Sequence, residues 1–409
     1  MILTNDQETA IKLILDRYAK GERYSVLAGV AGSGKSTCVK FIVEALSTRG
    51  INPDTDICYA AYTGKACQVL AKKGNSPVLT CHKMLWDFYP KENGTFFKKR
   101  RQRLEYKIAF IDECSMIGAD MLQELLKHRE THFIFCGDPE QLEPVKGKSE
   151  GESGYDILQH PTFFLSQVMR QAAESDIIRL SMQIREGKPI EYYKGIDAMI
   201  LPKTDLVEGM LTWADQILVG TNAVRTQINN KARELLGRGE EPEPGDRVIC
   251  LHNNWDISSR DGNALVNGTT GYLKQPFQKT ALIANRAGGG SIETICSTII
   301  CDDDDRFYDI TLDPQELKTG TPQITDWKRI SKINKFYNSP YAIERGIKNP
   351  LPDSFAYGYA ITCWKAQGSE WDKVLIIEEN FPFDREEHKR FLYTAITRAS
   401  QKVVLVRNA

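Results

Sequence analysis

The stretch LAGVAGSGKST, residues 27–37, restricts the fold more than any other part of this 409-residue chain. Residues 29–36 fit the pattern G-x-x-x-x-G-K-S/T, which is meaningful when a strand precedes it and a helix follows. Here the apolar run YSVLAGV leads into the loop, and CVKFIVEALSTRG follows with apolar residues three and four positions apart. The competing interpretation is a glycine turn without a function, which does not explain why a strand pattern precedes it and a helix pattern follows. The stretch therefore predicts a strand, a phosphate-binding loop and a helix.

Such a loop binds a nucleoside triphosphate because its glycines let backbone N–H groups approach the phosphates, which the start of the helix also favours. Lys35 is expected to reach the β- and γ-phosphates, and Ser36 to hold Mg²⁺. ATP and Mg²⁺ are the expected cofactors. The loop residues predicted to bind the nucleotide are Gly29, Ala31, Gly32, Ser33, Gly34, Lys35, Ser36 and Thr37.

Other short apolar runs alternate with helical patterns along the chain. DICYAAY, KIAFIDE and THFIFCGD follow the loop, and DQILVGT, DKVLIIEE and QKVVLVRNA form a second set nearer the C-terminus. Buried runs of this kind between helices are typical of parallel sheets covered by helices on both faces. We therefore expect an α/β protein with two such units.

Two stretches break this alternation. Residues 86–106 hold an Asn-Gly turn between aromatic and basic residues, which predicts a small hairpin arm. Residues 246–345 contain short strand-like runs with glycine turns, which predict a small β-barrel inserted into the second α/β unit.

Composition excludes several classes of protein. The net charge of −1 excludes a strongly basic coat for nucleic acid but permits a local basic track. The ten cysteines include no C-x-x-C pair, and His128 and His132 lack the glutamate of a zinc-binding helix motif. These features favour a reducing compartment without a zinc site. No apolar run approaches 18 residues and the polar start is unlike a signal peptide, so we expect a cytoplasmic protein that does not interact with membranes.

Two acidic residues and a glutamine follow strands predicted to lie beside the loop. Asp112 and Glu113 end the run IAFIDE; Asp112 is expected to hold Mg²⁺, and Glu113 to orient and deprotonate the attacking water. Gln141, in FCGDPEQLEPV, is expected to sense the γ-phosphate and position that water. Any one of these residues by itself would be interpreted as an ordinary surface residue. The functional interpretation depends on the phosphate-binding loop earlier in the chain.

Taken in order, the motifs resemble those of superfamily 1B helicases, the group that includes RecD and the Dda helicase of T-even phages. LTNDQ resembles the motif in which Gln7 would contact adenine, AAYTGKA motif Ia, and LTCHKML the element that precedes the arm. IDECSM resembles motif II, GDPEQLEPV motif III, and LSQVMRQ motif IV with Arg170. TNAVRTQIN resembles the start of the second motor domain, YAITCWKAQGSEWDKV motif V with Gly368, and LYTAITRAS motif VI with Arg398. The resemblance spans nearly the whole chain.

Two positions depart from the family pattern. Trp364 stands where motif V usually has a histidine, and Tyr62 replaces the usual proline of motif Ia. Neither position touches the phosphate chemistry. The Trp364 departure concerns a contact with DNA or between domains, and an aromatic ring there can still stack on a base.

The resemblance implies two RecA-like parallel-sheet domains with two insertions. The first, 1A, would comprise residues 1–85 and 107–168, with the arm 1B at 86–106. The second, 2A, would comprise 169–245 and 346–409, with an SH3-like barrel 2B at 246–345. Gln7, Gly368, Arg170 and Arg398 would join the nucleotide site, and the two arginines would act as arginine fingers when the domains close. A surface salt bridge is the alternative role for each arginine.

The same resemblance implies a path for single-stranded DNA, held mainly through its phosphates. Its residues would be Thr63, Lys65, Thr80 and His82 on the first domain, Asn222, Thr362 and Trp364 on the second, Asn267 on the barrel, and Trp86, Phe88 and Phe97 on the arm. An aromatic arm could wedge between base pairs at a fork. A small apolar core with a solvated basic flank is the alternative interpretation of the arm.

These features together predict an ATP-dependent DNA helicase that moves 5′ to 3′ on single-stranded DNA and separates duplexes. The direction comes from the resemblance alone. The alternatives are a translocase that displaces bound proteins with little unwinding, and a DNA-binding regulatory subunit with weak ATPase activity. No nuclease activity is expected. The implied partners are single-stranded and forked DNA and single-strand-binding or replication proteins, and the implied setting is a functional monomer in a bacterial or phage-infected cell.

Overall fold

The computed structural model describes residues 3–90, 96–143, 151–168, 175–252, 254–258, 264–302, 306–382 and 384–407. Two compact units are present. Unit 1 comprises residues 1–86, 100–206 and 363–409, and unit 2 comprises residues 87–99 and 207–362. No helix among the described residues has both the length and the apolar character that a membrane span requires.

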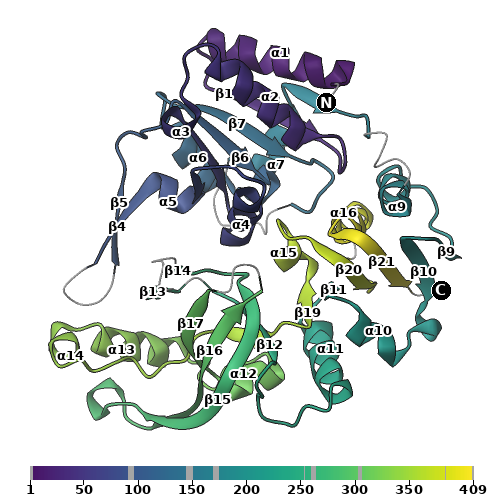
Figure 1. The fold of residues 1–409 in the computed structure, drawn as a ribbon. Helices are drawn as coiled ribbons and strands as arrows, with labels where there is room; N and C mark the ends of the chain where they lie inside the picture. Colours follow the sequence, from purple (N-terminus) through teal and green to yellow (C-terminus); the bar gives the residue numbers. More distant parts are fainter. Residues whose placement is uncertain are drawn as a thin grey trace. The chain divides into compact units, whose positions relative to one another are not determined.

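Unit 1 contains a six-stranded sheet in which every described pairing is parallel (Figure 1). In spatial order its strands are β3 (Val78–Thr80), β2 (Ile57–Ala61), β6 (Ile108–Asp112), β7 (His132–Gly137), β1 (Tyr24–Gly29) and β8 (Phe163–Leu165). Strands β1, β2, β6 and β7 are the four runs that the sequence predicts. The expected α/β fold with a parallel sheet is therefore confirmed.

Successive residues of these strands enter two separate apolar cores. Leu27 and Phe110 belong to one core, whereas Val26 and Ala109, their chain neighbours, belong to the other. This follows from the two-residue period of a strand, which turns alternate side chains to opposite faces. The helices and helical turns of this part are α1 (Asn5–Ala19), α2 (Lys35–Ser47), α3 (Pro53–Asp56), α4 (Gly64–Lys72), α5 (Cys81–Leu85), η1 (Cys114–Met116), α6 (Ala119–Leu126) and α7 (Gly154–Leu158).

The C-terminal part of the chain adds further strands to unit 1. β21 (Ala399–Arg407) pairs in parallel with both β10 (Ala198–Pro202) and β20 (Trp371–Ile377), and β9 (Tyr193–Lys194) pairs antiparallel with β10. The accompanying helices and helical turn are α9 (Asp176–Arg185), η2 (Lys203–Asp205), α15 (Cys363–Ala366) and α16 (Arg385–Ile396). α16 carries most of the motif VI sequence.

Unit 2 contains a short parallel pair and a larger antiparallel sheet. β11 (Gln216–Val219) pairs in parallel with β19 (Ala360–Thr362), next to α10 (Glu208–Trp213) and α11 (Asn222–Leu235). The antiparallel sheet has the order β17 (Phe307–Leu312), β16 (Ser291–Cys301), β15 (Thr270–Leu282), β12 (Arg247–Cys250) and β18 (Phe355–Tyr357). β13 (Asn254–Ser258) pairs with β14 (Ala264–Leu265).

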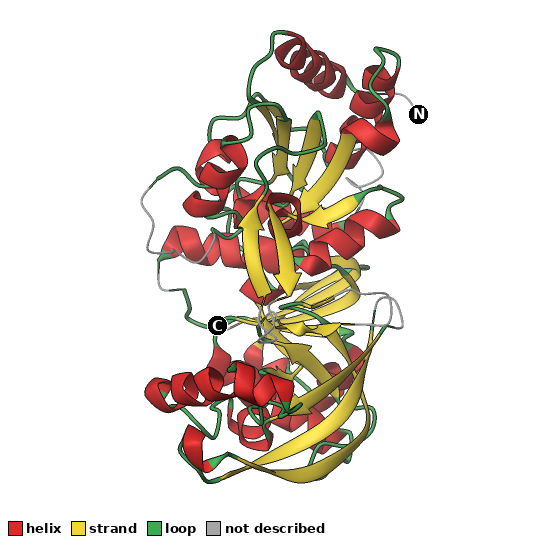
Figure 2. Ribbon diagram, turned by 90° about the vertical axis from the view of Figure 1, so that its left-hand side faces the viewer, coloured by secondary structure: helices red, strands yellow, loops and turns green. Residues whose placement is uncertain are grey.

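The inserted region contains longer strands than the short ones that the sequence predicts. β15 and β16 have 13 and 11 residues and form one long, curved hairpin (Figures 1 and 2). After β17 the chain is helical, in α12 (Pro314–Thr319), α13 (Trp327–Tyr337) and α14 (Pro340–Glu344), and η3 (Asn285–Ala287) lies at the tip of the hairpin. Asp313, Asp326 and Ser339 cap the N-termini of these helices. Such caps are a sequence signal for helices, but the strand-like runs nearby made it hard to recognise.

Two short strands occupy the predicted arm. β4 (Trp86–Pro90) and β5 (Phe96–Arg100) form a two-stranded sheet. The Asn-Gly turn itself lies outside the described residues, and so do the side chains of Phe88 and Phe97.

Candidate nucleotide site

The phosphate-binding loop needs glycine at two positions for different reasons. Gly34, the N-cap of α2, has φ 84°, a left-handed conformation that costs other residues strain. At Gly29 a Cβ atom would lie 2.9 Å from Cβ of Leu165 and 3.2 Å from its carbonyl oxygen. The loop can therefore turn tightly at the end of β1 only with glycine at both positions.

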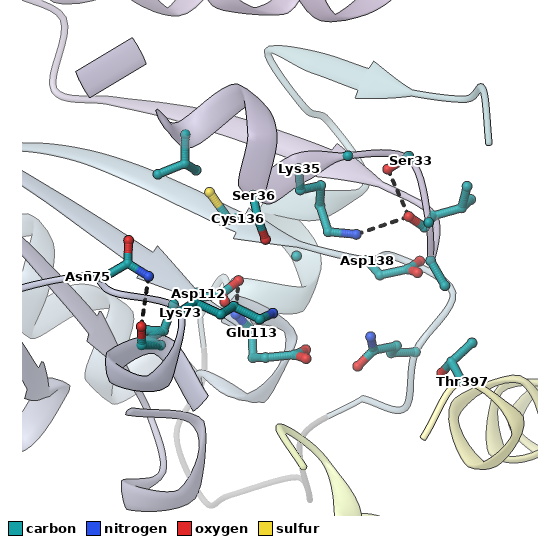
Figure 3. A pocket seen from close by; sticks show the side chains of 18 of the residues that line it. Ser33, Lys35, Ser36, Lys73, Asn75, Asp112, Glu113, Cys136, Asp138 and Thr397 are labelled. Carbon is teal, nitrogen blue, oxygen red and sulfur yellow. Dashed lines mark hydrogen bonds between the residues drawn. The ribbon is translucent and has the colours of Figure 1, made fainter. Parts of the chain in front are cut away.

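Lys35 lies at the start of α2 and points back along the loop. Its Nζ donates to the carbonyl oxygen of Val30 at 3.1 Å (Figure 3) and to that of Gly29 at 2.6 Å. The hydroxyl of Ser33 donates to Val30 as well, at 2.8 Å. The ammonium group is thus held over the mouth of the loop by carbonyl oxygens, where phosphate oxygens can replace them.

Asp112 and Glu113 stand at the end of β6, facing the same space. The backbone N–H of Glu113 donates to Asp112 Oδ1 at 3.0 Å, and Glu113 has φ 48°, a strained conformation for a residue with a side chain. Burial raises the pKa of Asp112, and the neighbouring Glu113 carboxylate raises it further. The Glu113 backbone N–H, Lys35 and Lys73 oppose this effect without cancelling it, so the pKa of Asp112 stays raised.

Gln141 and Arg398 complete a connected polar group with Glu113. Arg398 Nη1 lies 3.7 Å from Glu113 Oε1. In the amide orientation that satisfies both neighbours, Gln141 donates to Glu113 Oε2 at 3.1 Å and accepts from Arg398 Nη2 at 3.3 Å. Arg398 is almost fully buried and also donates to the carbonyl oxygens of Thr394 and Ser369. Motifs II, III and VI therefore meet at one point.

A second link joins motif VI to the loop through a buried tyrosine. The Tyr393 hydroxyl donates to Asp138 Oδ2 at 2.5 Å and accepts from the backbone N–H of Ala31 at 3.1 Å. Burial raises the pKa of Asp138, whereas Lys35 and the Tyr393 hydroxyl oppose the rise. Sequence reasoning missed both residues, because a tyrosine inside a helix and an aspartate in a loop give no local signal of their contact.

Replacing Tyr393 with phenylalanine should destabilise the fold by about 1–3 kcal/mol, because it leaves the Asp138 carboxylate and the Ala31 N–H without their shared partner. The loss should grow with pH. The pKa of Asp138 is raised in the folded state, so the stability that its neutral form provides is lost as the pH rises above the ordinary aspartate pKa. The Tyr393 hydroxyl reduces this loss by stabilising the charged carboxylate, and phenylalanine cannot. Thermal unfolding between pH 4 and pH 8 measures both effects. Tyr155→Phe, at a buried tyrosine that packs under Arg390, is the control, and an equal loss in the two variants would contradict the assignment.

The phosphate-binding loop, the end of β6 and Arg398 line a cavity of about 680 Å³. Of the residues predicted to bind nucleotide or metal, it is lined by Ala31, Gly32, Ser33, Gly34, Lys35, Ser36, Asp112, Glu113, Gln141 and Arg398. Tyr59, Leu70, Lys73 and Asn75 also line it and were not predicted. They come from β2 and from the end of α4, so only the packing of these elements beside the loop reveals them.

Other predicted nucleotide residues lie outside this lining. Gln7 is buried; its side chain shares a capping box with Thr4, and its Nε2 donates to the carbonyl oxygen of Ser33 at 3.2 Å, so it supports the loop from behind. Gly368 has φ 74° and lies against Ala66 and Thr63. Gly29 and Thr37 flank the lining residues, and Arg170 lies outside the described residues. Nucleotide contacts by these residues stay predictions.

The DNA residues predicted on the first domain follow two adjacent strands. Thr63 caps α4 after β2, and Thr80 caps α5 after β3, so both lie at the carboxyl edge of the sheet. Lys65 is buried in α4. The ring of His82 lies between those of Tyr62 and Trp86, with centroids 5.8 and 5.5 Å away. The structure therefore brings this predicted set to one edge.

The remaining predicted DNA residues are more dispersed. Thr362 ends β19, and Asn222 begins α11 just after β11, so they share the carboxyl edge of the short parallel pair in unit 2. Asn267 lies in the turn before β15. Trp364, in unit 1, packs its ring against Phe381 and Phe391, with centroids 5.9 and 6.3 Å away, which gives this departure from the family pattern a packing role.

Comparison with known proteins places these features in a family. An AAA domain description matches residues 2–200, and a UvrD-like helicase C-terminal domain description matches residues 357–406. The chain is 30% identical to the RecBCD enzyme subunit RecD of Buchnera aphidicola over 432 residues, covering 92% of this chain and 69% of that protein.

Two other curated relatives are longer than this chain. The ATP-dependent RecD2 DNA helicase of Deinococcus radiodurans is 25% identical over 95% of this chain and 47% of its own length. The ATP-dependent DNA helicase dda of Enterobacteria phage T4 is 29% identical over 46% of this chain and 43% of its own length. The matched parts therefore span less than half of each of these relatives.

Solved structures agree on the fold. A Pif1 helicase from Bacteroides, solved in complex with ADP-AlF3 and ssDNA, has a TM-score of 0.54 at 17% identity, covering 99% of this chain and 92% of that one. The likeness extends to the RecA-like parallel-sheet core. The resemblance read from the motifs is confirmed: this chain belongs to the superfamily 1B helicase family of RecD-like and Dda-like proteins.

Proposed function

We propose that this protein is an ATP-dependent DNA helicase that moves 5′ to 3′ along single-stranded DNA and separates duplex DNA. The observation that carries the proposal is the cavity in which Lys35, Asp112, Glu113, Gln141 and Arg398 meet. Each has a position suited to phosphoryl transfer from ATP, and two of the relatives are named as ATP-dependent DNA helicases. The direction rests on the family alone.

In this proposal each side chain has a separate task. Lys35 exchanges its carbonyl partners for the β- and γ-phosphates of ATP. Glu113 takes a proton from the attacking water, which Gln141 helps to orient. Arg398 stabilises the charge that develops on the transferring phosphoryl group.

The residues present also suit Mg²⁺. Ser36 and Asp112 both face the cavity with oxygen atoms, the ligand type that Mg²⁺ prefers. Burial raises the pKa of Asp112, and a bound cation would favour its ionised form. When bound, the metal would neutralise phosphate charge. Ser36 and Asp112 are the residues proposed to hold it.

We propose that ATP hydrolysis is coupled to movement along DNA by the domains that the sequence predicts. Residues 1–85 with 107–168 would form motor domain 1A, and residues 169–245 with 346–409 would form 2A. Residues 86–106 would form a hairpin arm that splits the fork, and residues 246–345 an SH3-like barrel 2B. ATP binding and hydrolysis would close and open the motor domains, and alternating grip would move the strand.

The proposed path of the DNA strand is supported by residues at the carboxyl edges of the parallel strands, because parallel-sheet proteins bind ligands at that edge. These residues are Thr63, Thr80, Asn222 and Thr362. A monomer would suffice for this stepping. Single-strand-binding or replication proteins are proposed as further partners.

Lys35→Ala should abolish ATP hydrolysis that single-stranded DNA stimulates in the unaltered protein. The variant removes the cation that faces the phosphates. The measurement is the rate of phosphate release with and without single-stranded DNA, with Lys12→Ala, an exposed lysine on α1, as the control. Hydrolysis indifferent to DNA in the unaltered protein would overturn the helicase proposal and favour a regulatory subunit with weak ATPase activity.

A forked duplex separates the helicase from the alternative translocase. We expect strand separation on a fork with a 5′ single-stranded tail and little on one with a 3′ tail. Stimulated hydrolysis together with removal of a bound protein but no strand separation would favour the translocase.

A further inference from the structure

Helix α13 carries a group of exposed basic side chains in a protein whose net charge is only −1. Lys328, Arg329, Lys332 and Lys335 are all exposed. Their spacing of three and four residues brings them to one side of the helix. Four positive charges therefore lie on one face of this helix.

The opposite face of α13 is fixed by a core of its own. Ile333 and Tyr337 are buried with Ile283, Ala287 and Ile292 from the tip of the β15–β16 hairpin. The Tyr337 hydroxyl accepts from the backbone N–H of Ala284 at 2.9 Å. The helix and the hairpin tip lie together in Figure 1. The apolar face of α13 therefore packs against the hairpin tip, which holds the helix in place with its basic face exposed.

The acidic side chains of the same region keep their charge but make other contacts. Asp326 caps the helix and accepts from the Lys328 backbone N–H, while Glu293 is engaged by Thr280. Glu344 is exposed on α14. Among the residues that the structure describes, Lys328, Arg329, Lys332 and Lys335 form no ion pair, and Arg329 reaches only the Gly289 carbonyl, at 3.5 Å.

Aromatic rings accompany the basic side chains. Trp327, the first residue of α13, is 76% exposed, so most of its side-chain surface is open to a ligand. Tyr341 on α14 is 41% exposed, with the guanidinium groups of Arg345 and Arg286 at 4.1 and 5.2 Å from its ring centroid. We define the α13 surface as Trp327, Lys328, Arg329, Lys332, Lys335 and Tyr341.

We propose that the α13 surface binds single-stranded DNA, with its basic residues on phosphates and a base stacked on Trp327. This site is additional to the strand path along the motor domains, and it rests on the proposed function. Exposed aromatic rings beside a row of basic residues are the combination that single-stranded nucleic acid requires. A lipid surface suits the helix less well, because lipid binding needs an apolar face, and here that face is buried.

The test measures how salt affects binding of a long single strand. The variant carries Lys328→Gln, Arg329→Gln, Lys332→Gln and Lys335→Gln. The matched control replaces the exposed lysines Lys12, Lys194, Lys203 and Lys402 with glutamine. Fluorescence anisotropy with a labelled oligothymidylate of about 40 nucleotides gives Kd between 50 and 200 mM salt. Thermal unfolding confirms that each variant is folded.

Loss of four phosphate contacts should reduce the slope of log Kd against log salt by about 3, because each contact contributes about 0.7 for single strands. Trp327→Ala should weaken binding about 5- to 150-fold while the slope is kept, because stacking involves no charge. Trp327→Phe should retain most of the affinity.

Three results would overturn the inference. An equal slope in the α13 variant, the control and the unaltered protein would show that the surface makes no phosphate contacts. A loss of slope that is as large for a blunt duplex as for the single strand, with no effect of Trp327→Ala, would assign the surface to duplex DNA. Binding of vesicles containing phosphatidylserine that the α13 variant abolishes, with an unchanged DNA slope, would assign it to lipid. Hydrolysis that DNA does not stimulate in the unaltered protein would instead be a failure of the proposed function.

Discussion

Replacing Arg398 with alanine should lower kcat for ATP hydrolysis by about 10³-fold or more, because an arginine finger contributes at least this factor to phosphoryl transfer. Arg398 is buried against Glu113 and Gln141 in the nucleotide cavity. Its charge should matter chiefly in the transition state, so the binding of ATP should change far less than the rate. Arg398→Lys should recover little, because lysine lacks the planar fork of donors.

Single-turnover hydrolysis and binding of a fluorescent ATP analogue measure these two effects separately. Arg385→Ala, at an exposed arginine at the start of α16, is the matched control. A large loss of ATP binding with little change in the hydrolysis rate would show that Arg398 serves the ground state and would contradict its role as a finger.

Glu113→Gln should lower kcat by about 10²- to 10⁴-fold, the usual contribution of a general base. The amide keeps the size of the side chain and can still contact Gln141 and Arg398, but it cannot take a proton. Removing the Glu113 charge also lowers the pKa of Asp112 toward its ordinary value, since that charge is one cause of the rise. Asp112 should then hold Mg²⁺ at least as well as before.

The measurement is kcat and KM for ATP across a Mg²⁺ titration. We expect kcat to fall while KM and the Mg²⁺ requirement change little. Glu140→Gln is the control, because Glu140 belongs to the motif III loop but does not line the cavity. A higher Mg²⁺ requirement with an unchanged maximal rate would show that Glu113 acts on the metal rather than on water.

The sequence was sufficient to predict the strands around the loop, because β1, β2, β6 and β7 are continuous apolar runs that only a covered parallel sheet buries. It was less informative in the inserted region. There α12 and α13 are largely polar, and their apolar residues bury a face only against the long β15–β16 hairpin and its surroundings. A helix stabilised mainly by such packing has a weak local pattern.

The sequence by itself determined the phosphate-binding loop and the residue types at the nucleotide site. Lys35, Asp112, Glu113 and Gln141 are recognisable because their motifs directly follow strands, and Arg398 because LYTAITRAS resembles motif VI. Tertiary structure alone decided that Tyr393 bridges Asp138 and Ala31, and that Lys73 and Asn75 reach the cavity. These contacts join elements far apart in sequence, and they arise from packing, which leaves no periodic trace in the chain.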